Sequence, residues 1–161
     1  MIEFNYIDYP SNIAEMCYEA RSMGYKTIIA HAEKYKSLHD DMQLLESVLA
    51  EGALLQINAS SILNKEYKEY YKFANELLNR RLVSFVASDV HDLINRGVYL
   101  DEAYNVVKKK YGDAYADKIF NLNQLNILSD EYIEVPSLTP ARRGLFSNLF
   151  NKLRFNKLQD K

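Results

Sequence analysis

Short apolar runs alternate with longer amphipathic segments along most of this chain, and this alternation constrains its fold more than any other feature. A continuous apolar run occupies residues 27–30, mostly apolar runs occupy residues 53–57 and 82–87, and residues 1–7 alternate apolar with polar side chains. Short runs rich in Ile, Val, Leu and Phe are typical of strands, and uninterrupted ones favour strands buried on both faces. The pattern therefore predicts about four strands separated by helices.

Between the apolar runs, hydrophobic residues recur at helical spacing. The spacing predicts a helix that opens at Pro10 and Ser11 and stops at Gly24, and further helices at about 40–51, 65–80, 99–111 and 114–122. Strands and helices in turn favour an α/β fold whose parallel strands are joined by right-handed crossovers. The carboxyl ends of such strands share one edge of the sheet, where ligands bind.

Composition excludes several other classes of protein. The 161 residues are 48% hydrophobic and 26% charged, with 20 Lys and Arg against 22 Asp and Glu, which fits a soluble domain without bulk attraction to nucleic acid. No apolar run approaches the ~18 residues of a membrane-spanning helix. The single cysteine, Cys17, cannot form an internal disulfide, which fits a reducing cytoplasm.

Titratable side chains follow the predicted strands directly. His31 comes after the run at 27–30, Asp89 and His91 come after the run at 82–87, and Glu3 lies within the first strand. Because alternate residues of an extended chain point to the same side, Asp89 and His91 could bind one cluster of metal ions. Other interpretations stay open: a turn capped by the aspartate, a core histidine at position 31, and an exposed edge residue at position 3.

Arg96 and Cys17 are the other candidates for phosphate chemistry. The Arg96 guanidinium could hold a phosphate oxygen, although a solvated loop arginine is the alternative. Cysteine phosphatases carry an arginine six positions after the nucleophile, whereas position 23 here is Met23. Cys17 also falls within a predicted helix among apolar residues, which favours an inert, packed thiol.

Four motifs in order resemble one known family. They are Ile2-Glu3-Phe4, residues 24–35 with His31-Ala32-Glu33-Lys34-Tyr35 at their end, Leu55-Gln56-Ile57-Asn58-Ala59-Ser60-Ser61, and Val86-Ala87-Ser88-Asp89-Val90-His91. The chain is similar, over about residues 1–133, to the capsule and exopolysaccharide-locus protein-tyrosine phosphatases of bacteria. That family belongs to the polymerase and histidinol phosphatase (PHP) superfamily.

The resemblance implies a distorted (β/α) barrel with a cluster of metal ions, usually manganese, at the carboxyl ends of its strands. Glu3, His31, Asp89 and His91 match the family's metal ligands, with His91 also at the catalytic centre, and Arg96 matches an arginine that binds the substrate phosphate. The implied reaction is hydrolysis of phosphotyrosine by metal-activated water, on a bacterial autokinase that regulates capsule or exopolysaccharide assembly.

The sequence departs from the family in two places. Where the family has His-Pro-Glu-Arg-Tyr, this chain has Lys34 as a point charge that could still attract phosphate. The family's first strand with His-x-His is also absent, so we expect an N-terminally truncated, partial barrel that binds metal weakly and turns over slowly. A non-catalytic regulatory remnant and a phosphatase for a small ester such as histidinol phosphate are the alternatives.

The end of the chain differs from the rest. We expect residues 1–135 to form the phosphatase portion and residues 136–161 to form a basic, aromatic-rich tail. Its basic and apolar side chains could lie on an anionic membrane surface near a membrane-bound kinase. A short helix packed on the body or a disordered end is the alternative. Oligomerisation is possible.

Overall fold

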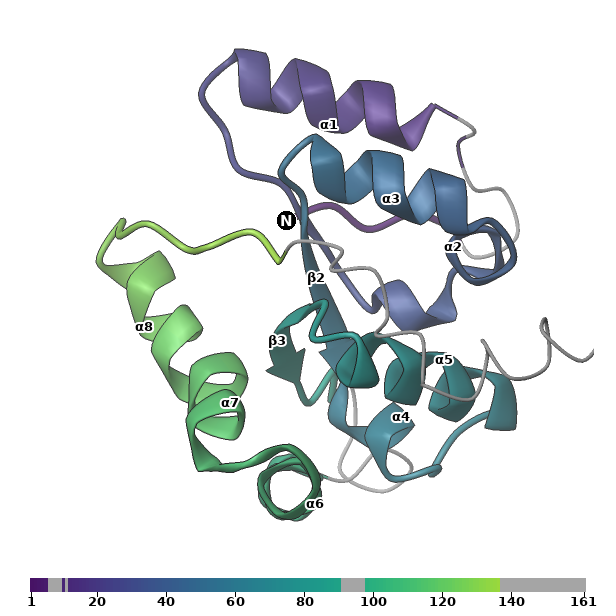
Figure 1. The fold of residues 1–161 in the computed structure, drawn as a ribbon, viewed down its shortest axis with the longest axis vertical. Coiled ribbons are helices and arrows are strands. Elements are labelled where there is room, and N and C mark those ends of the chain that lie inside the picture. The colour runs from purple at the N-terminus through teal and green to yellow at the C-terminus, as the bar shows by residue number, and fades with distance from the viewer. Residues whose placement is uncertain (6–9, 11, 91–97, 137–161) are drawn as a thin grey trace, which may run out of the picture.

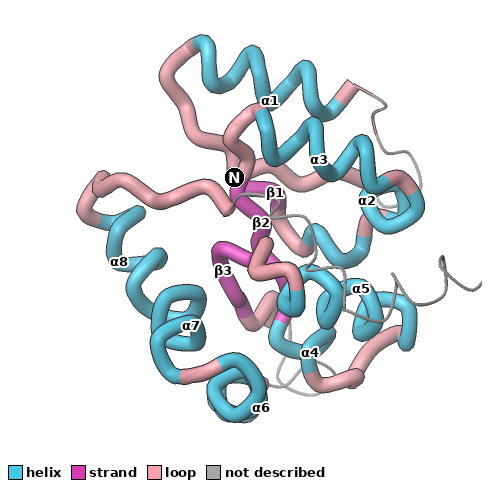
Figure 2. Tube along the Cα trace, viewed as in Figure 1, coloured by secondary structure: helices cyan, strands magenta, loops and turns pink. Residues whose placement is uncertain are grey.

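In a computed structural model of the chain, which describes residues 1–5, 10, 12–90 and 98–136, a small parallel sheet is surrounded by helices (Figures 1 and 2). The sheet has three strands, β1 (Ile28–Ile29), β2 (Leu54–Asn58) and β3 (Val83–Ala87), in the order β1-β2-β3. Both pairs are parallel. The strands predicted at 27–30, 53–57 and 82–87 are thus present, the first shortened to two residues, and all five residues of β2 are buried.

The strand predicted at residues 1–7 is wrong within the described residues, where it is reduced to one parallel bridge between Ile2 and Ile29. The Ile2 N–H donates to the Ile28 carbonyl at 2.8 Å, and the Ala30 N–H donates to the Ile2 carbonyl at 3.0 Å. At Phe4 the backbone contacts a side chain instead of a strand. The Tyr35 hydroxyl accepts from the Phe4 N–H at 2.8 Å and lies 3.3 Å from the Phe4 carbonyl. A side chain therefore satisfies backbone groups that a neighbouring strand would otherwise bind.

The first half contains the two predicted helices, with different boundaries, and two short elements that were not predicted. The predicted helices are α1 (Ile13–Ser22) and α3 (Met42–Ala50), and the other two elements are the 3-10 turn η1 (Ala32–Lys34) and α2 (Lys36–Asp40). The helix predicted at 40–51 starts at Met42, because the Asp41 carboxylate accepts from the Gln43 and Leu44 N–H groups as an N-cap. Helices α1 and α3 pack against each other beside the sheet (Figure 1).

The second half contains more helix than predicted. The short α4 (Ala59–Ile62) directly follows β2, and α5 (Lys68–Asn79) and α6 (Leu100–Tyr111) match the predicted helices at 65–80 and 99–111. The helix predicted at 114–122 is part of a longer helical run, α7 (Asp113–Asp117), the π-helical turn η2 (Lys118–Leu122) and α8 (Asn123–Leu128).

This last helical run closes the outer edge of β3 with side chains. The Asn123 amide donates to the Ser84 carbonyl at 2.8 Å, and the Gln124 amide donates to the Ile119 carbonyl at 2.8 Å and lies 3.4 Å from the Val86 carbonyl. Both residues come directly after the π-helical turn, a widened turn that recurs at structurally special positions. Helix side chains therefore cover the edge strand.

The larger of two hydrophobic clusters joins the sheet to the helices. Its fully buried members include Ile13, Leu45, Leu55, Ile57 and Leu77, drawn from α1, α3, β2 and α5. Cys17 lies in the same core, where burial raises the pKa of its thiol, in agreement with the expected packed cysteine. Among the described residues, no helix has the length and apolar character needed to cross a membrane.

The predicted tail and domain boundary largely fall outside the structure. Residues 137–161 lie outside the described residues, so the domain division and the membrane-surface idea stay predictions.

Candidate metal and phosphate site

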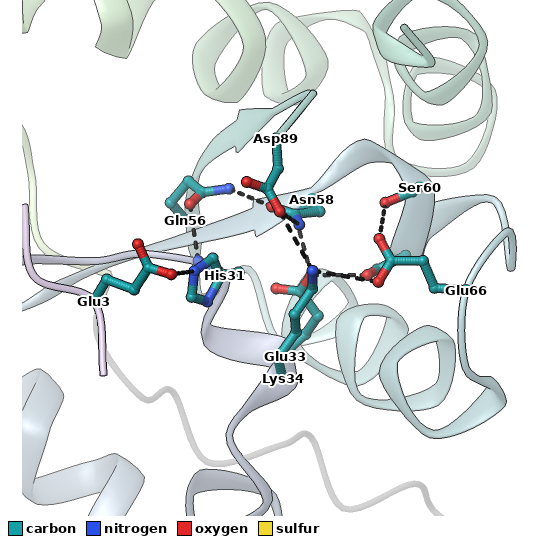
Figure 3. Close-up of polar contacts among 10 residues, drawn as sticks. Glu3, His31, Glu33, Lys34, Gln56, Asn58, Ser60, Glu66 and Asp89 are labelled. Carbon is teal, nitrogen blue, oxygen red and sulfur yellow. Dashed lines mark hydrogen bonds and ion pairs between the residues drawn. The ribbon is translucent and has the colours of Figure 1, made fainter. Parts of the chain in front are cut away.

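Two of the predicted metal ligands lie in direct contact. His31 follows β1 and Glu3 follows the Ile2 bridge, and the Glu3 Oε1 lies 3.0 Å from the His31 Nε2 (Figure 3). The His31 side chain is 5% exposed and the Glu3 side chain is 66% exposed. The pair thus combines a buried imidazole with a carboxylate that solvent reaches.

Asp89 lies at the carboxyl end of β3 and is held by a different set of partners. Its Oδ2 accepts from the Asn58 amide at 2.8 Å and lies 3.3 Å from the Lys34 Nζ. The same ammonium lies 3.3 Å from the Glu66 Oε2, and the Glu66 Oε1 accepts from the Ser60 hydroxyl at 2.5 Å. Lys34, the predicted phosphate-binding residue, is therefore buried between two carboxylates in this structure.

Two side-chain amides from β2 connect the Glu3–His31 pair to Asp89. The His31 N–H donates to the Gln56 Oε1 at 2.8 Å, and the Gln56 Nε2 donates to the Asn58 Oδ1 at 3.0 Å (Figure 3). Asn58 then donates to Asp89 as described. Sequence reasoning assigned no role to Gln56 or Asn58. The available signal was a glutamine inside an otherwise apolar strand, followed at the next same-side position by an asparagine.

Glu33 is a third residue whose role sequence reasoning missed. Its Oε1 accepts from the Ser61 hydroxyl at 2.8 Å and from the Asn58 N–H at 3.1 Å, which ties η1 to the end of β2. The Oε2 has no hydrogen-bond partner among the described residues. Burial raises the pKa of the Glu33 carboxyl to about 7, against the lowering effect of the two hydrogen bonds.

A cavity of about 530 Å³ adjoins this network. Its lining includes Glu33 and Lys34 and the aromatic side chains of Tyr67, Tyr70 and Phe73. Tyr67 and Tyr70 meet edge to face with ring centroids 5.3 Å apart. The cavity is large enough for part of a peptide, and it begins beside the residues that surround Lys34.

The Glu3–His31 pair has the donor types that divalent metals bind, imidazole nitrogen and carboxylate oxygen. The 3.0 Å between the two atoms is the length of a direct hydrogen bond or ion pair between them. Among the described residues, no group of three or more His, Cys, Asp or Glu side chains could hold a metal. Asp89 is linked to the pair through the amides, while His91 and Arg96 lie outside the described residues.

Comparison with known proteins identifies the family. Residues 1–129 match the family described as capsular polysaccharide synthesis, CpsB/CapC. The tyrosine-protein phosphatase CpsB of Streptococcus agalactiae serotype III is 35% identical over 116 residues, which are 69% of this chain and 48% of the relative. CapC of Staphylococcus aureus is 36% identical over 153 residues, covering 92% of this chain and 59% of CapC.

A solved structure agrees with the sequence matches. It comes from a study of YwqE from Bacillus subtilis and CpsB from Streptococcus pneumoniae, described as unique metal-dependent tyrosine phosphatases, and it superposes with a TM-score of 0.78. The sequences are 27% identical, and the alignment covers 86% of this chain and 57% of that one. The chain spans about half the length of the curated relatives it matches. By its family match, its relatives and its fold, the chain belongs to the CpsB/CapC family of capsular polysaccharide synthesis proteins.

Proposed function

We propose that this chain serves metal-dependent hydrolysis of phosphotyrosine in proteins, with manganese as the metal. The observation that carries the proposal is the contact between the Glu3 carboxylate and the His31 imidazole beside the ends of β1 and β3, in a chain whose relatives are named tyrosine phosphatases. Glu3, His31, Asp89 and His91 would hold the metal. Carboxylate oxygen and imidazole nitrogen both suit manganese.

The bound metal would lower the pKa of a water molecule and offset negative charge on the phosphoryl oxygens. The chain's own residues would orient the substrate. Arg96 would bind phosphate oxygens through its guanidinium fork. Lys34 would add a positive charge next to Asp89, since its ammonium lies 3.3 Å from that carboxylate. Its two carboxylate partners hold this charge in place, which limits its reach toward phosphate.

The cavity beside Lys34 supports a protein substrate over a small ester. Aromatic walls from Tyr67, Tyr70 and Phe73 would pack against apolar side chains that flank a phosphotyrosine. A bacterial autokinase that phosphorylates its own tyrosines is the substrate class that the family suggests. A small ester such as histidinol phosphate would leave these walls uncovered.

Binding of Mn²⁺ to the purified chain, measured by isothermal titration calorimetry, tests the metal site. We expect Glu3→Gln and His31→Ala to weaken binding by at least about tenfold, the loss that even residues supporting a metal ligand produce. Glu46→Gln, at an exposed position of α3, is the matched control and should bind like the unaltered chain. Equal affinity of Glu3→Gln and the control would show that Glu3 is not a ligand.

Turnover of a phosphotyrosine peptide tests the reaction. Since the described residues supply no group of three ligands, we expect the chain alone to be slow. Joined to the part of the S. agalactiae relative that the match leaves uncovered, it should gain Mn²⁺-dependent turnover. Asp89→Ala should abolish this gain. Peptide binding without turnover in either form would favour a non-catalytic regulatory role instead.

A further inference from the structure

A directional chain of hydrogen bonds crosses β2 between two proposed metal ligands. It runs from the His31 N–H through the side chains of Gln56 and Asn58 to the Asp89 carboxylate, with donor–acceptor distances of 2.8, 3.0 and 2.8 Å. A backbone N–H can only donate, and an ionised carboxylate can only accept. The two ends therefore fix which way both amides face.

The strand geometry explains why Gln56 and Asn58 form the middle of this series of hydrogen bonds. Gln56 and Asn58 are two positions apart on β2, so their side chains project to the same side. Strand β2 lies between β1 and β3, whose carboxyl ends lead into His31 and Asp89. Gln56 is 6% exposed and Asn58 is fully buried, so water cannot replace a hydrogen bond that a reversed amide would lose.

The two residues at the ends of this series of hydrogen bonds, His31 and Asp89, have backbone conformations that need support. His31 has a φ of 35° and Asp89 a φ of 51°, in the left-handed region that residues other than glycine rarely adopt. Such conformations persist where surrounding contacts hold them. The amides supply such contacts, one to the backbone of His31 and the other to the side chain of Asp89.

We infer that Gln56 and Asn58 are positioning residues that act as one relay, which sets the place of His31 relative to Asp89. The value of this relay for catalysis rests on the proposed function. The coupling between its two ends is a property of the fold and can be measured without metal. A change at Asp89 should therefore alter the contribution of Gln56 to stability, and the reverse.

A double-variant cycle tests the coupling. Gln56→Glu keeps an oxygen for the His31 N–H but replaces the nitrogen that donates to Asn58. The Asn58 amide must turn to donate to the new carboxylate, and its oxygen then faces the Asp89 carboxylate. Asp89→Asn provides a donor for that oxygen, so the double variant restores an unbroken set of hydrogen bonds in which the two bonds made by Asn58 are reversed and the His31 N–H still donates to position 56.

Thermal unfolding at pH 8.5 in EDTA gives the first readout. We expect Gln56→Glu to lower Tm by about 5 °C, and the double variant to melt at least about 3 °C above the sum of the two single effects. Asn123→Asp is the matched control, because it removes another buried amide donor, to the Ser84 carbonyl, outside the relay. Its effect should add to that of Asp89→Asn. If the Tm changes of Gln56→Glu and Asp89→Asn simply add in the double variant, the relay does not exist.

Titration with Mn²⁺ gives the second readout and separates positioning from general stability. Gln56→Glu removes no proposed ligand, yet we expect it to weaken Mn²⁺ binding about tenfold, while Asn123→Asp leaves binding unchanged. Unchanged affinity in Gln56→Glu would overturn the positioning role. If the unaltered chain itself fails to bind Mn²⁺, the proposed function fails, and the melting cycle still decides whether the relay exists.

Discussion

Replacing Glu33 by glutamine should remove much of the chain's pH-dependent stability. The Glu33 carboxyl has a pKa of about 7 in the folded chain, raised from 4.5 because the group is buried. The folded chain therefore holds this proton more tightly than the unfolded chain does. As pH rises from 4.5 toward 7, the unfolded state loses the proton first, so stability falls with pH across this window.

The size of the effect follows from the width of the window. Each unit of pKa difference corresponds to about 1.4 kcal/mol, so between pH 5 and pH 8 the unaltered chain should lose about 3 kcal/mol through Glu33. Glutamine keeps an oxygen for the Asn58 N–H and the Ser61 hydroxyl, and it does not titrate. Its nitrogen would take the place of Oε2, which has no hydrogen-bond partner among the described residues, at a cost of about 1–3 kcal/mol at every pH.

Urea unfolding in EDTA at pH 5, 6, 7 and 8 measures this difference. We expect the free energy of unfolding of the unaltered chain to fall by about 3 kcal/mol more than that of Glu33→Gln over this range. Glu46→Gln on the exposed face of α3 should track the unaltered chain. Parallel pH profiles for Glu33→Gln and the unaltered chain would refute the argument.

Other predictions concern ion pairing, capping and the cavity. Lys34→Met leaves the Asp89 and Glu66 carboxylates without their shared cation and should lower the free energy of unfolding in urea by about 3 kcal/mol, whereas Lys34→Arg should lose less. An equally stable Lys34→Met would contradict this. Asp41→Ala removes the acceptor for two N–H groups at the start of α3 and should cost about 1 kcal/mol in the same assay, while Asp41→Asn should retain most of the stability. Tyr67→Ala should weaken binding of a fluorescent phosphotyrosine peptide about fivefold without changing Tm, because Tyr67 is 67% exposed and lines the cavity. Unchanged anisotropy titrations would place the peptide elsewhere.

The parts of the fold that could be predicted are those whose pattern is set by burial. Strands β2 and β3 are buried along nearly their whole length, so short, mostly apolar runs identified them. The strand at residues 1–7 was overpredicted because its alternating pattern could not reveal that the Tyr35 hydroxyl binds the Phe4 backbone. Short elements such as η1 and α4 carry too few residues for a periodic signal.

Some features of the candidate site could likewise be predicted from the sequence and others could not. Position after a strand predicted that His31 and Asp89 lie at one edge of the sheet, and the structure links them through β2 and brings Glu3 into contact with His31. Their role as metal ligands stays a prediction. Position after a strand could not show that Lys34 is buried between two carboxylates, because Glu66 comes from a segment far along the chain. Nor could it show that Glu33 points inward to Ser61, since a charged residue in a short turn is usually exposed.

The Asn123 and Gln124 amides on β3 have a consequence for association between molecules. An edge strand with open carbonyl groups is a template onto which a foreign strand can add, and proteins often shield such edges to stay dispersed at high concentration. Here two helix side chains lie at the Ser84 and Val86 carbonyls, so an incoming chain would have to displace both before it could zip onto the sheet. The side chains that follow the π-helical turn thus protect the β3 edge from strand addition and fibril formation.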